Sequence, residues 1–397
     1  PSRRRIFQAA AAVGLGAGLP QADAAGSRHA SRHAPKQASS LDAKLKAHVK
    51  NVVVIYLENR SFNNLFANFP GLAAPLPSSA PQKDRDGSIL PVLPKIWGGM
   101  VPGRQDVGGK EYLIGEDKIV NLPNAPFALK DADGKPLPEA LVTRDLVHNF
   151  YHNQMQINGG KNDAFVAWGD SGALVMGHYG ETEKNLGLWQ IAREYTLCDN
   201  FFMGAFGGSY LNHQFLISGR TPEFFNAAQT PAKKKIAVLE DGPLGHRLAV
   251  APDSPKSALD GKPHFVNNGA ITPDGYAVNT MAPPFQPSWV RPAPGGDTQA
   301  ADPMDPSVLP PQSYDTIGDL LSRAGVSWAW YGGAWQAAID GRGAGQRPNF
   351  QQHHQPFNYF RQFAPGTQAR SEHLRDGGLG DSPISNRFIA DVVAGKL

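Results

Sequence analysis

The chain has 397 residues, a formal net charge of +3 at pH 7 and only 18% charged residues. Its 43 glycines and 34 prolines favour a loop-rich globular enzyme over a coiled coil, a helical repeat or a disordered protein. Three of the positive charges are Arg3, Arg4 and Arg5, and without them the chain is close to neutral, so its charge gives no reason to expect nucleic-acid binding.

The first 24 residues resemble a twin-arginine export signal. The three arginines precede a weakly apolar stretch at residues 9–19, and residues 22–24 have the Ala-x-Ala form of a signal peptidase site. The apolar stretch is too short to span a bilayer. We therefore expect a periplasmic or secreted protein that starts near Ala25 and has the twin-arginine export machinery as a partner. A chance basic N-terminus is the alternative.

Residues 25–46 have no apolar periodicity and predict a flexible linker before a catalytic domain at residues 47–397. Cys198 is the one cysteine, so no intrachain disulfide can form, and we expect this thiol to lie in the core.

Residues 52–57, a run of Val, Ile, Tyr and Leu, predict a strand buried on both faces inside a parallel or mixed sheet. Glu58 and Asn59 follow directly. Because chemistry in open α/β sheets collects at the carboxyl ends of strands, these two oxygen ligands favour a divalent-cation site. Alternatively, Asn59 or Ser61 caps a short helix over residues 62–66.

Residues 145–154 predict a helix that ends at residues 157–160. His148 and His152 are four residues apart and share a face, which would allow them to chelate a metal, although no acidic third ligand is near. For His152 we expect a structural, hydrogen-bonded role. Before this helix, tight turns are predicted at residues 86–87 and 133–134, both Asp-Gly.

Residues 185–195 predict a helix, and residues 196–202 a short strand. The helix positions that should face the sheet are Leu188, Ile191, Ala192 and Tyr195.

Gly207 and Gly208 permit a sharp turn before a helix that Gly219 should end. Ser209 therefore lies at a helix N-terminus, where free N–H groups favour an anion. Its hydroxyl is either a simple N-cap or a nucleophile. The G-x-S-x-G motif of α/β-hydrolases is absent, because Leu211 occupies the last glycine position.

The C-terminal third begins with a Pro/Gly/Asp-rich insertion at about residues 241–312, which we expect to rim the active site. A helix at 316–324 and a strand at 326–331 then fit a doubly wound sheet. His353 and His354 lie in a loop before a proline, and a last helix is predicted from residue 386 to 396.

Residues 58–62, Glu-Asn-Arg-Ser-Phe, resemble the opening motif of the bacterial acid phosphatase/phospholipase C phosphoesterase family, which belongs to the alkaline phosphatase superfamily. Three further stretches are similar to family motifs and occur in the same order: residues 145–165, 207–213 and 353–357. The phospholipase branch has Thr-x-Pro-Asn-Arg where this chain has Ser209 to His213. That departure favours the acid phosphatase branch.

The resemblance implies an α/β sandwich like that of alkaline phosphatase, with a central, mostly parallel sheet flanked by helices. It implies an acid phosphatase that hydrolyses phosphate monoesters through a phosphoserine and needs one divalent metal ion. A phospholipase C-type phosphodiesterase and a non-catalytic exported phosphate-binding protein are the alternatives. The family's paired acidic metal ligands would lie beyond residue 397, so we expect the chain to be truncated at its C-terminus.

The resemblance also assigns roles to individual residues. Ser209 would be the nucleophile and would contact the metal, which Glu58 and Asn59 also bind. His148, His354 and His353 would be active-site histidines, and His354 is preferred because adjacent side chains usually point apart. Asn212 and Lys161 would contact the substrate.

Overall fold

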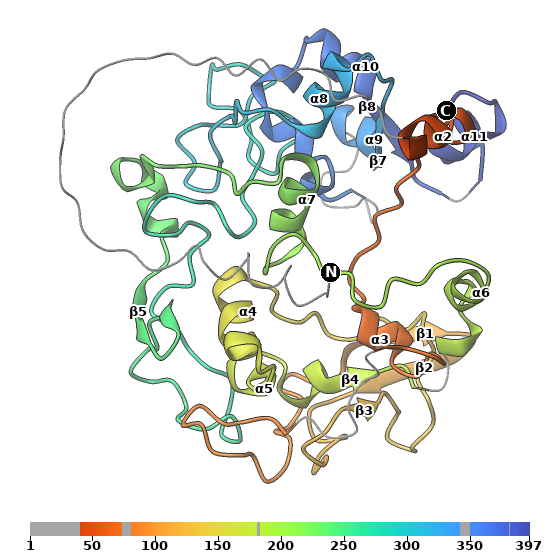
Figure 1. Cartoon of the computed structure of the whole chain (residues 1–397). Helices are drawn as coiled ribbons and strands as arrows, with labels where there is room; N and C mark the ends of the chain where they lie inside the picture. Colours follow the sequence, from red (N-terminus) through yellow and green to blue (C-terminus); the bar gives the residue numbers. More distant parts are fainter. Residues whose placement is uncertain (1–39, 74–80, 181–182, 342–349, 381) are drawn as a thin grey trace. The chain divides into compact units, whose positions relative to one another are not determined.

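The computed structural model describes residues 40–73, 81–180, 183–341, 350–380 and 382–397 (Figure 1). The predicted export signal and the linker up to residue 39 lie outside the described residues. The chain divides into two compact units, Pro1–Ile55 and Tyr56–Leu397. In the first unit, helix α2 (Ser40–His48) occupies part of the predicted linker.

The predicted strand at residues 52–57 is wrong, because this segment forms no regular element and is largely exposed. Val52 is 81% and Ile55 is 72% exposed. The strand predicted at residues 196–202 is also absent, and Phe201 and Cys198 are exposed, contrary to the expected burial of the thiol. An apolar run becomes a buried strand only when neighbouring strands pair with it, and no described strand pairs with either segment.

The described residues form a mixed α/β fold with four two-stranded sheets. Strands β1 (Val101–Val107) and β2 (Lys110–Ile114) are antiparallel, as are β5 (Leu239–Gly242) and β6 (Gly245–Leu248). Two pairs are parallel: β3 (Phe127–Ala128) with β4 (Gly177–His178), and β7 (Trp330–Gly333) with β8 (Leu374–Gly378). The predicted large central sheet is not present among the described residues.

A first core lies mainly within residues 90–180, is joined by Ala258, and gathers buried side chains that include Leu93, Met100, Leu137 and Val166. Its loops turn at Gly87 and Gly134, whose φ angles of 88° and 78° favour glycine. Each of these turns lies between antiparallel bridge partners, which confirms the two predicted tight turns.

Helices α4 (Phe150–Ile157) and α5 (Phe165–Trp168) pack on β6 around a second cluster of buried side chains. Helix α4 begins five residues later than predicted and ends where predicted, at the left-handed residue Asn158.

Helix α6 (Gly187–Glu194) forms as predicted, but it buries a different face. Trp189 is the buried residue, and its Nε1 donates to the Leu65 carbonyl of α3 (Phe62–Phe66) at 2.8 Å. Ile191 and Tyr195, which were expected to face a sheet, are exposed because that sheet is not there.

The largest core joins helix α7 (Ser209–Ser218) to the segment that follows residue 350. Tyr210, Leu211 and Ile217 of α7 pack against the short 3₁₀ helices η6 (Gln352–His354) and η7 (Pro356–Tyr359). Gly219 ends α7 with a φ of 62°, as predicted. This packing places the start of α7 beside the two adjacent histidines.

The predicted insertion is a packed part of the structure that contains little regular secondary structure. Beyond β5 and β6 it is held by isolated bridges such as Ala282 with Val308, and by side-chain bonds to the core. One such bond runs from the Tyr359 hydroxyl to the Met281 carbonyl at 2.8 Å.

The C-terminal part places helices around the β7–β8 pair (Figure 1). The predicted helices at 316–324 and 386–396 are confirmed as α8 (Ile317–Arg323) and α11 (Arg387–Val393). The predicted strand begins at Trp330, later than expected. The other elements here are α9 (Trp335–Ile339) and α10 (Gln368–His373).

The remaining 3₁₀ helices are η1 (Asn158–Gly160), η2 (Gly172–Met176), η3 (Glu183–Asn185), η4 (Ala227–Gln229), η5 (Pro231–Lys235) and η8 (Arg361–Phe363). Within the described residues, no helix combines the length and the apolar character that crossing a membrane requires.

Candidate active site

The turn before α7 fixes the position of Ser209. Asn212 holds this turn, because its Nδ2 donates to the carbonyls of Gly207 and Gly208 at 3.3 and 3.2 Å. Its Oδ1 accepts from the Ala205 N–H at 3.2 Å. Asn212 is buried, and both ends of its amide bind backbone, so in this structure it supports the turn. Its predicted contact with substrate stays a prediction.

Ser209 forms a side-chain pair with His353. The Ser209 Oγ lies 3.0 Å from His353 Nε2. Burial, together with the neighbouring His354 and His213, lowers the pKa of His353 to about 3. The ring is therefore neutral at pH 7, and one of its nitrogens is an acceptor. With the acceptor at Nε2, His353 can take the hydroxyl proton of Ser209.

Glu58 forms a second pair, with the other histidine of η6. His354 Nε2 and Glu58 Oε1 are 2.7 Å apart. Burial by itself would raise the pKa of Glu58, but the hydrogen bond from His354 and the charges of the nearby histidines lower it to about 2. Glu58 is therefore a carboxylate at neutral pH and accepts the hydrogen bond.

His213 joins these two pairs. Its Nδ1 is 2.8 Å from the Ser209 carbonyl, which can only accept, so the proton is on Nδ1 and Nε2 carries a free lone pair. Burial lowers the pKa of His213 to about 4, and the ring stays neutral at pH 7. It stacks on His354 with ring centroids 4.9 Å apart.

Glu58, His213 and His354 could hold a metal ion, since one ligand atom from each lies within 4.8 Å of the others. Two further observations fit a metal. Glu58 Oε2 is buried, and no described group donates to it. Two imidazoles and a carboxylate are also a donor set typical of zinc or another first-row transition ion, rather than of magnesium or calcium.

His148 lies against the same turn. A Cβ atom built on Gly208 would be 2.6 Å from the His148 carbonyl oxygen and 2.8 Å from its Cδ2. The ring is about half exposed, and its Nδ1 bonds the Leu146 carbonyl at 2.6 Å. The structure thus brings together Ser209, His353, His354, Glu58 and His148 from the predicted set.

The other predicted site residues lie at the edge of this group or outside it. Asn59 follows Glu58 with an exposed side chain and a φ of 69°. Lys161 lies in the exposed turn after α4. His152 is buried against Phe265, and its Nδ1 has no partner among the described residues, so the expected hydrogen bond is missing at that atom.

Ser61 caps α3, since its Oγ accepts from the Asn64 N–H at 3.1 Å. The helix-cap interpretation of the segment therefore applies to Ser61, while Glu58, three residues earlier, reaches the histidine group. A cap and a metal ligand are compatible within one short segment.

His213 is the site residue that the sequence analysis missed. Its signal was present, because it follows Ser209 by four residues on a predicted helix and so shares a helix face with it. Side chains at that spacing lie one turn apart, which is how the His213 ring reaches the backbone carbonyl of Ser209.

A comparison with protein-family models matched residues 49–397 to the Phosphoesterase family. Searches of the curated proteins and of the solved structures found no match.

Proposed function

Since the chain belongs to the Phosphoesterase family and is therefore a phosphoester hydrolase, we propose that it is an exported, metal-dependent acid phosphatase. The observation that carries the proposal is the 3.0 Å contact between Ser209 Oγ and His353 Nε2, beside the Glu58–His213–His354 group. A hydroxyl within hydrogen-bond reach of a neutral imidazole is an activated nucleophile.

The proposed reaction has two steps. In the first, Ser209 Oγ attacks phosphorus as His353 Nε2 takes its proton; the bond from phosphorus to the leaving oxygen breaks, and that oxygen is protonated. In the second, water attacks the phosphoserine and gives a proton to the group that protonated the leaving oxygen, while the bond from phosphorus to Ser209 Oγ breaks and His353 returns its proton to that oxygen. The N-terminus of α7, a helix of ten residues, offers backbone N–H groups to the phosphoryl oxygens.

Glu58, His213 and His354 would hold one divalent ion, with Asn59 and Ser209 as further predicted ligands. A bound divalent ion would supply positive charge that stabilises the attacking oxygen and the phosphoryl group. Each histidine would bind the ion through an unprotonated ring nitrogen. The hydrogen bond from His213 Nδ1 to the Ser209 carbonyl would keep Nε2 oriented as a ligand.

His148 is proposed to donate the proton that the leaving oxygen takes. Its support is its position against Gly208, the residue before the nucleophile. Lys161 and Asn212 remain predicted substrate contacts.

The test is hydrolysis of p-nitrophenyl phosphate by the wild type and by Ser209→Ala, with and without a chelator. Ser209→Ala is expected to lower kcat by about a thousandfold or more, because the nucleophile is lost. Ser218→Ala, at the other end of the same helix, is the matched control and should keep wild-type activity. Wild-type turnover by Ser209→Ala would refute the proposal.

Two further measurements test the metal requirement and the substrate class. If the chelator leaves the rate of hydrolysis unchanged, the proposed metal requirement is wrong. If bis-p-nitrophenyl phosphate is the better substrate, the protein is a phosphodiesterase. Export is tested by N-terminal sequencing of secreted protein, which should begin near Ala25. Secreted protein that retains Arg3 would contradict removal of the signal.

A further inference from the structure

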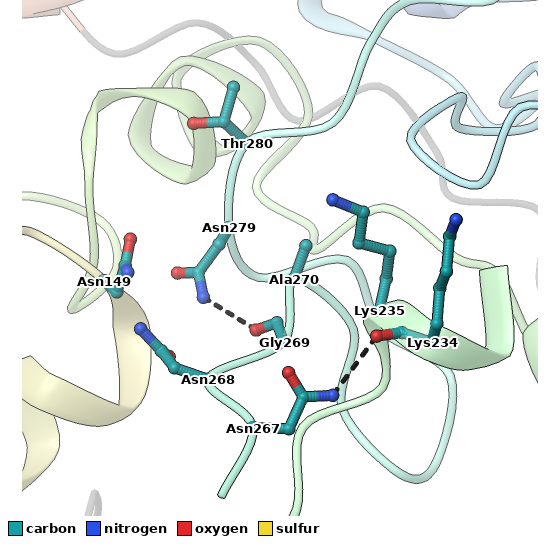
Figure 2. Close-up of a pocket in the computed structure, with 9 residues that line it drawn as sticks. All are labelled: Asn149, Lys234, Lys235, Asn267, Asn268, Gly269, Ala270, Asn279 and Thr280. Carbon is teal, nitrogen blue, oxygen red and sulfur yellow. Dashed lines mark hydrogen bonds between the residues drawn. The ribbon is translucent and has the colours of Figure 1, made fainter. Parts of the chain in front are cut away.

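A polar cavity of about 420 Å³ lies beside the N-terminus of α4, where Asn149 forms part of its lining (Figure 2). Four segments line it: Asn149 before α4, the end of η5, and the loops at residues 267–270 and 279–280. Its volume is within the range of small-molecule sites. None of its residues belongs to the proposed catalytic group.

The cavity lining carries positive charge and amide groups. Lys234 and Lys235 are on one side of the view in Figure 2, and the amides of Asn149, Asn268 and Asn279 gather on the other. None of the described residues that line the cavity is acidic. Two ammonium groups without a carboxylate favour a dianion, and side-chain amides pair with hydroxyl groups as donor and acceptor.

The walls of the cavity are held in place by hydrogen bonds. Asn279 accepts from the Phe150 N–H at 2.9 Å and donates to the Gly269 carbonyl at 3.0 Å, so it ties α4 to the loop. Asn267 donates to the Lys234 and Ile236 carbonyls at 3.2 and 2.7 Å. A Cβ at position 269 would lie 2.1 Å from the Lys235 carbonyl oxygen, so only glycine allows this close approach.

Asn268 is the amide that the protein leaves partly unused. Its Oδ1 is buried, and no described group donates to it. A half-turn of the amide exchanges Oδ1 with Nδ2, so the group can offer a ligand either an acceptor or a donor. Buried polar atoms normally have partners, and a ligand hydroxyl would supply one here.

From these observations we propose that the cavity binds a small phosphorylated polyol, of the size of a sugar phosphate. The phosphate dianion would lie against Lys234 and Lys235, and the hydroxyl groups would pair with the amides of Asn149 and Asn268. The proposal goes beyond the phosphatase function, because it concerns binding at residues that the reaction does not use.

The test is calorimetric titration with glucose 6-phosphate, carried out on the Ser209→Ala protein so that the probe is not hydrolysed. Removing both lysine charges with Lys234→Ala/Lys235→Ala is expected to raise Kd by about tenfold or more, since two charge-assisted contacts are lost. Lys233→Ala is the control: it removes one positive charge from the same 3₁₀ helix at a residue that does not line the cavity, and Kd should change less than about twofold.

A second comparison tests the polyol part. Glucose 6-phosphate should bind more tightly than inorganic phosphate, and Asn268→Ala should reduce that preference. Equal affinities for the two probes would overturn the proposal, as would an equal loss in Lys233→Ala, which would indicate general charge attraction only. If no binding is detected at about 10 mM glucose 6-phosphate, the affinity is too weak to be useful, and the proposal is also overturned. Hydrolysis of p-nitrophenyl phosphate tests the role of Ser209 separately.

Discussion

Replacing Gly208 by alanine should disable the active site while leaving the fold intact. The new Cβ would lie 2.6 Å from the His148 carbonyl oxygen, roughly 0.8 Å inside ordinary van der Waals contact. Backbone strain adds little, because Gly208 has φ −76° and ψ −178°, which alanine adopts freely. The clash must be relieved by moving His148, the start of α7, or both.

Either movement separates groups that the proposed reaction needs together. A misplacement approaching 1 Å costs up to about a hundredfold in rate, so we expect kcat/KM for p-nitrophenyl phosphate to fall about tenfold to a hundredfold. The assay is steady-state hydrolysis, with thermal unfolding of the same samples to show that the variant is folded.

Gly219→Ala is the control, at the other end of the same helix. Gly219 has a φ of 62° and open space around it, so alanine there should cost about 1 kcal/mol of stability with little effect on rate. Wild-type kcat/KM in Gly208→Ala would refute the placement of His148 against the nucleophile turn.

Three further predictions concern stability. Burial lowers the pKa of His152 to about 4 from an unfolded value near 6.5. Stability present above pH 6.5 is therefore lost as pH falls through 4, by about 3 kcal/mol in all. Urea unfolding at pH 7 and pH 5 should show that His152→Leu removes this pH dependence of the unfolding free energy and that the exposed His246→Gln keeps it. An unchanged pH dependence in His152→Leu would show that another group causes it. Asp391→Asn removes a buried carboxylate that pairs with two arginines and should lower the free energy of unfolding by about 2 kcal/mol. An unchanged free energy of unfolding would show that these ion pairs contribute nothing to stability. Thr316→Ala removes the capping box that it forms with Asp319 and should cost about 1 kcal/mol, seen as faster amide exchange in α8; unchanged exchange would contradict the role of the cap.

Local signals in the sequence were sufficient for most helices. Gly219 ends α7 and Thr316 begins α8, as predicted, because a left-handed glycine and a side-chain cap act within one turn of the chain. The two Asp-Gly turns were predicted correctly for the same reason. Caps and tight turns depend on neighbours that are only a few residues away.

The predicted strands failed where burial had to come from distant partners. Residues 52–57 and 196–202 have the composition of buried strands, yet neither pairs with a described strand, and most of their apolar side chains are exposed. Composition indicates what a segment can do in a sheet, but the pairing itself is a long-range contact. The buried face of α6 was mistaken for the same reason, since Trp189 packs on α3 instead of on a sheet.

The sequence by itself determined the kinds of chemistry available: a serine at a helix start, adjacent histidines before a proline, and a carboxylate after an apolar run. Only the tertiary structure decided how they combine. Ser209 meets His353 across 144 residues of chain, and Glu58 meets His354 across 296. The first contact depends on how α7 packs against η6, and the second on where the segment at Glu58 meets η6; no local pattern specifies either. In the structure His353 contacts Ser209 and His354 contacts Glu58. Adjacent side chains on one short 3₁₀ helix point in different directions, and these two rings lie at 86° to each other.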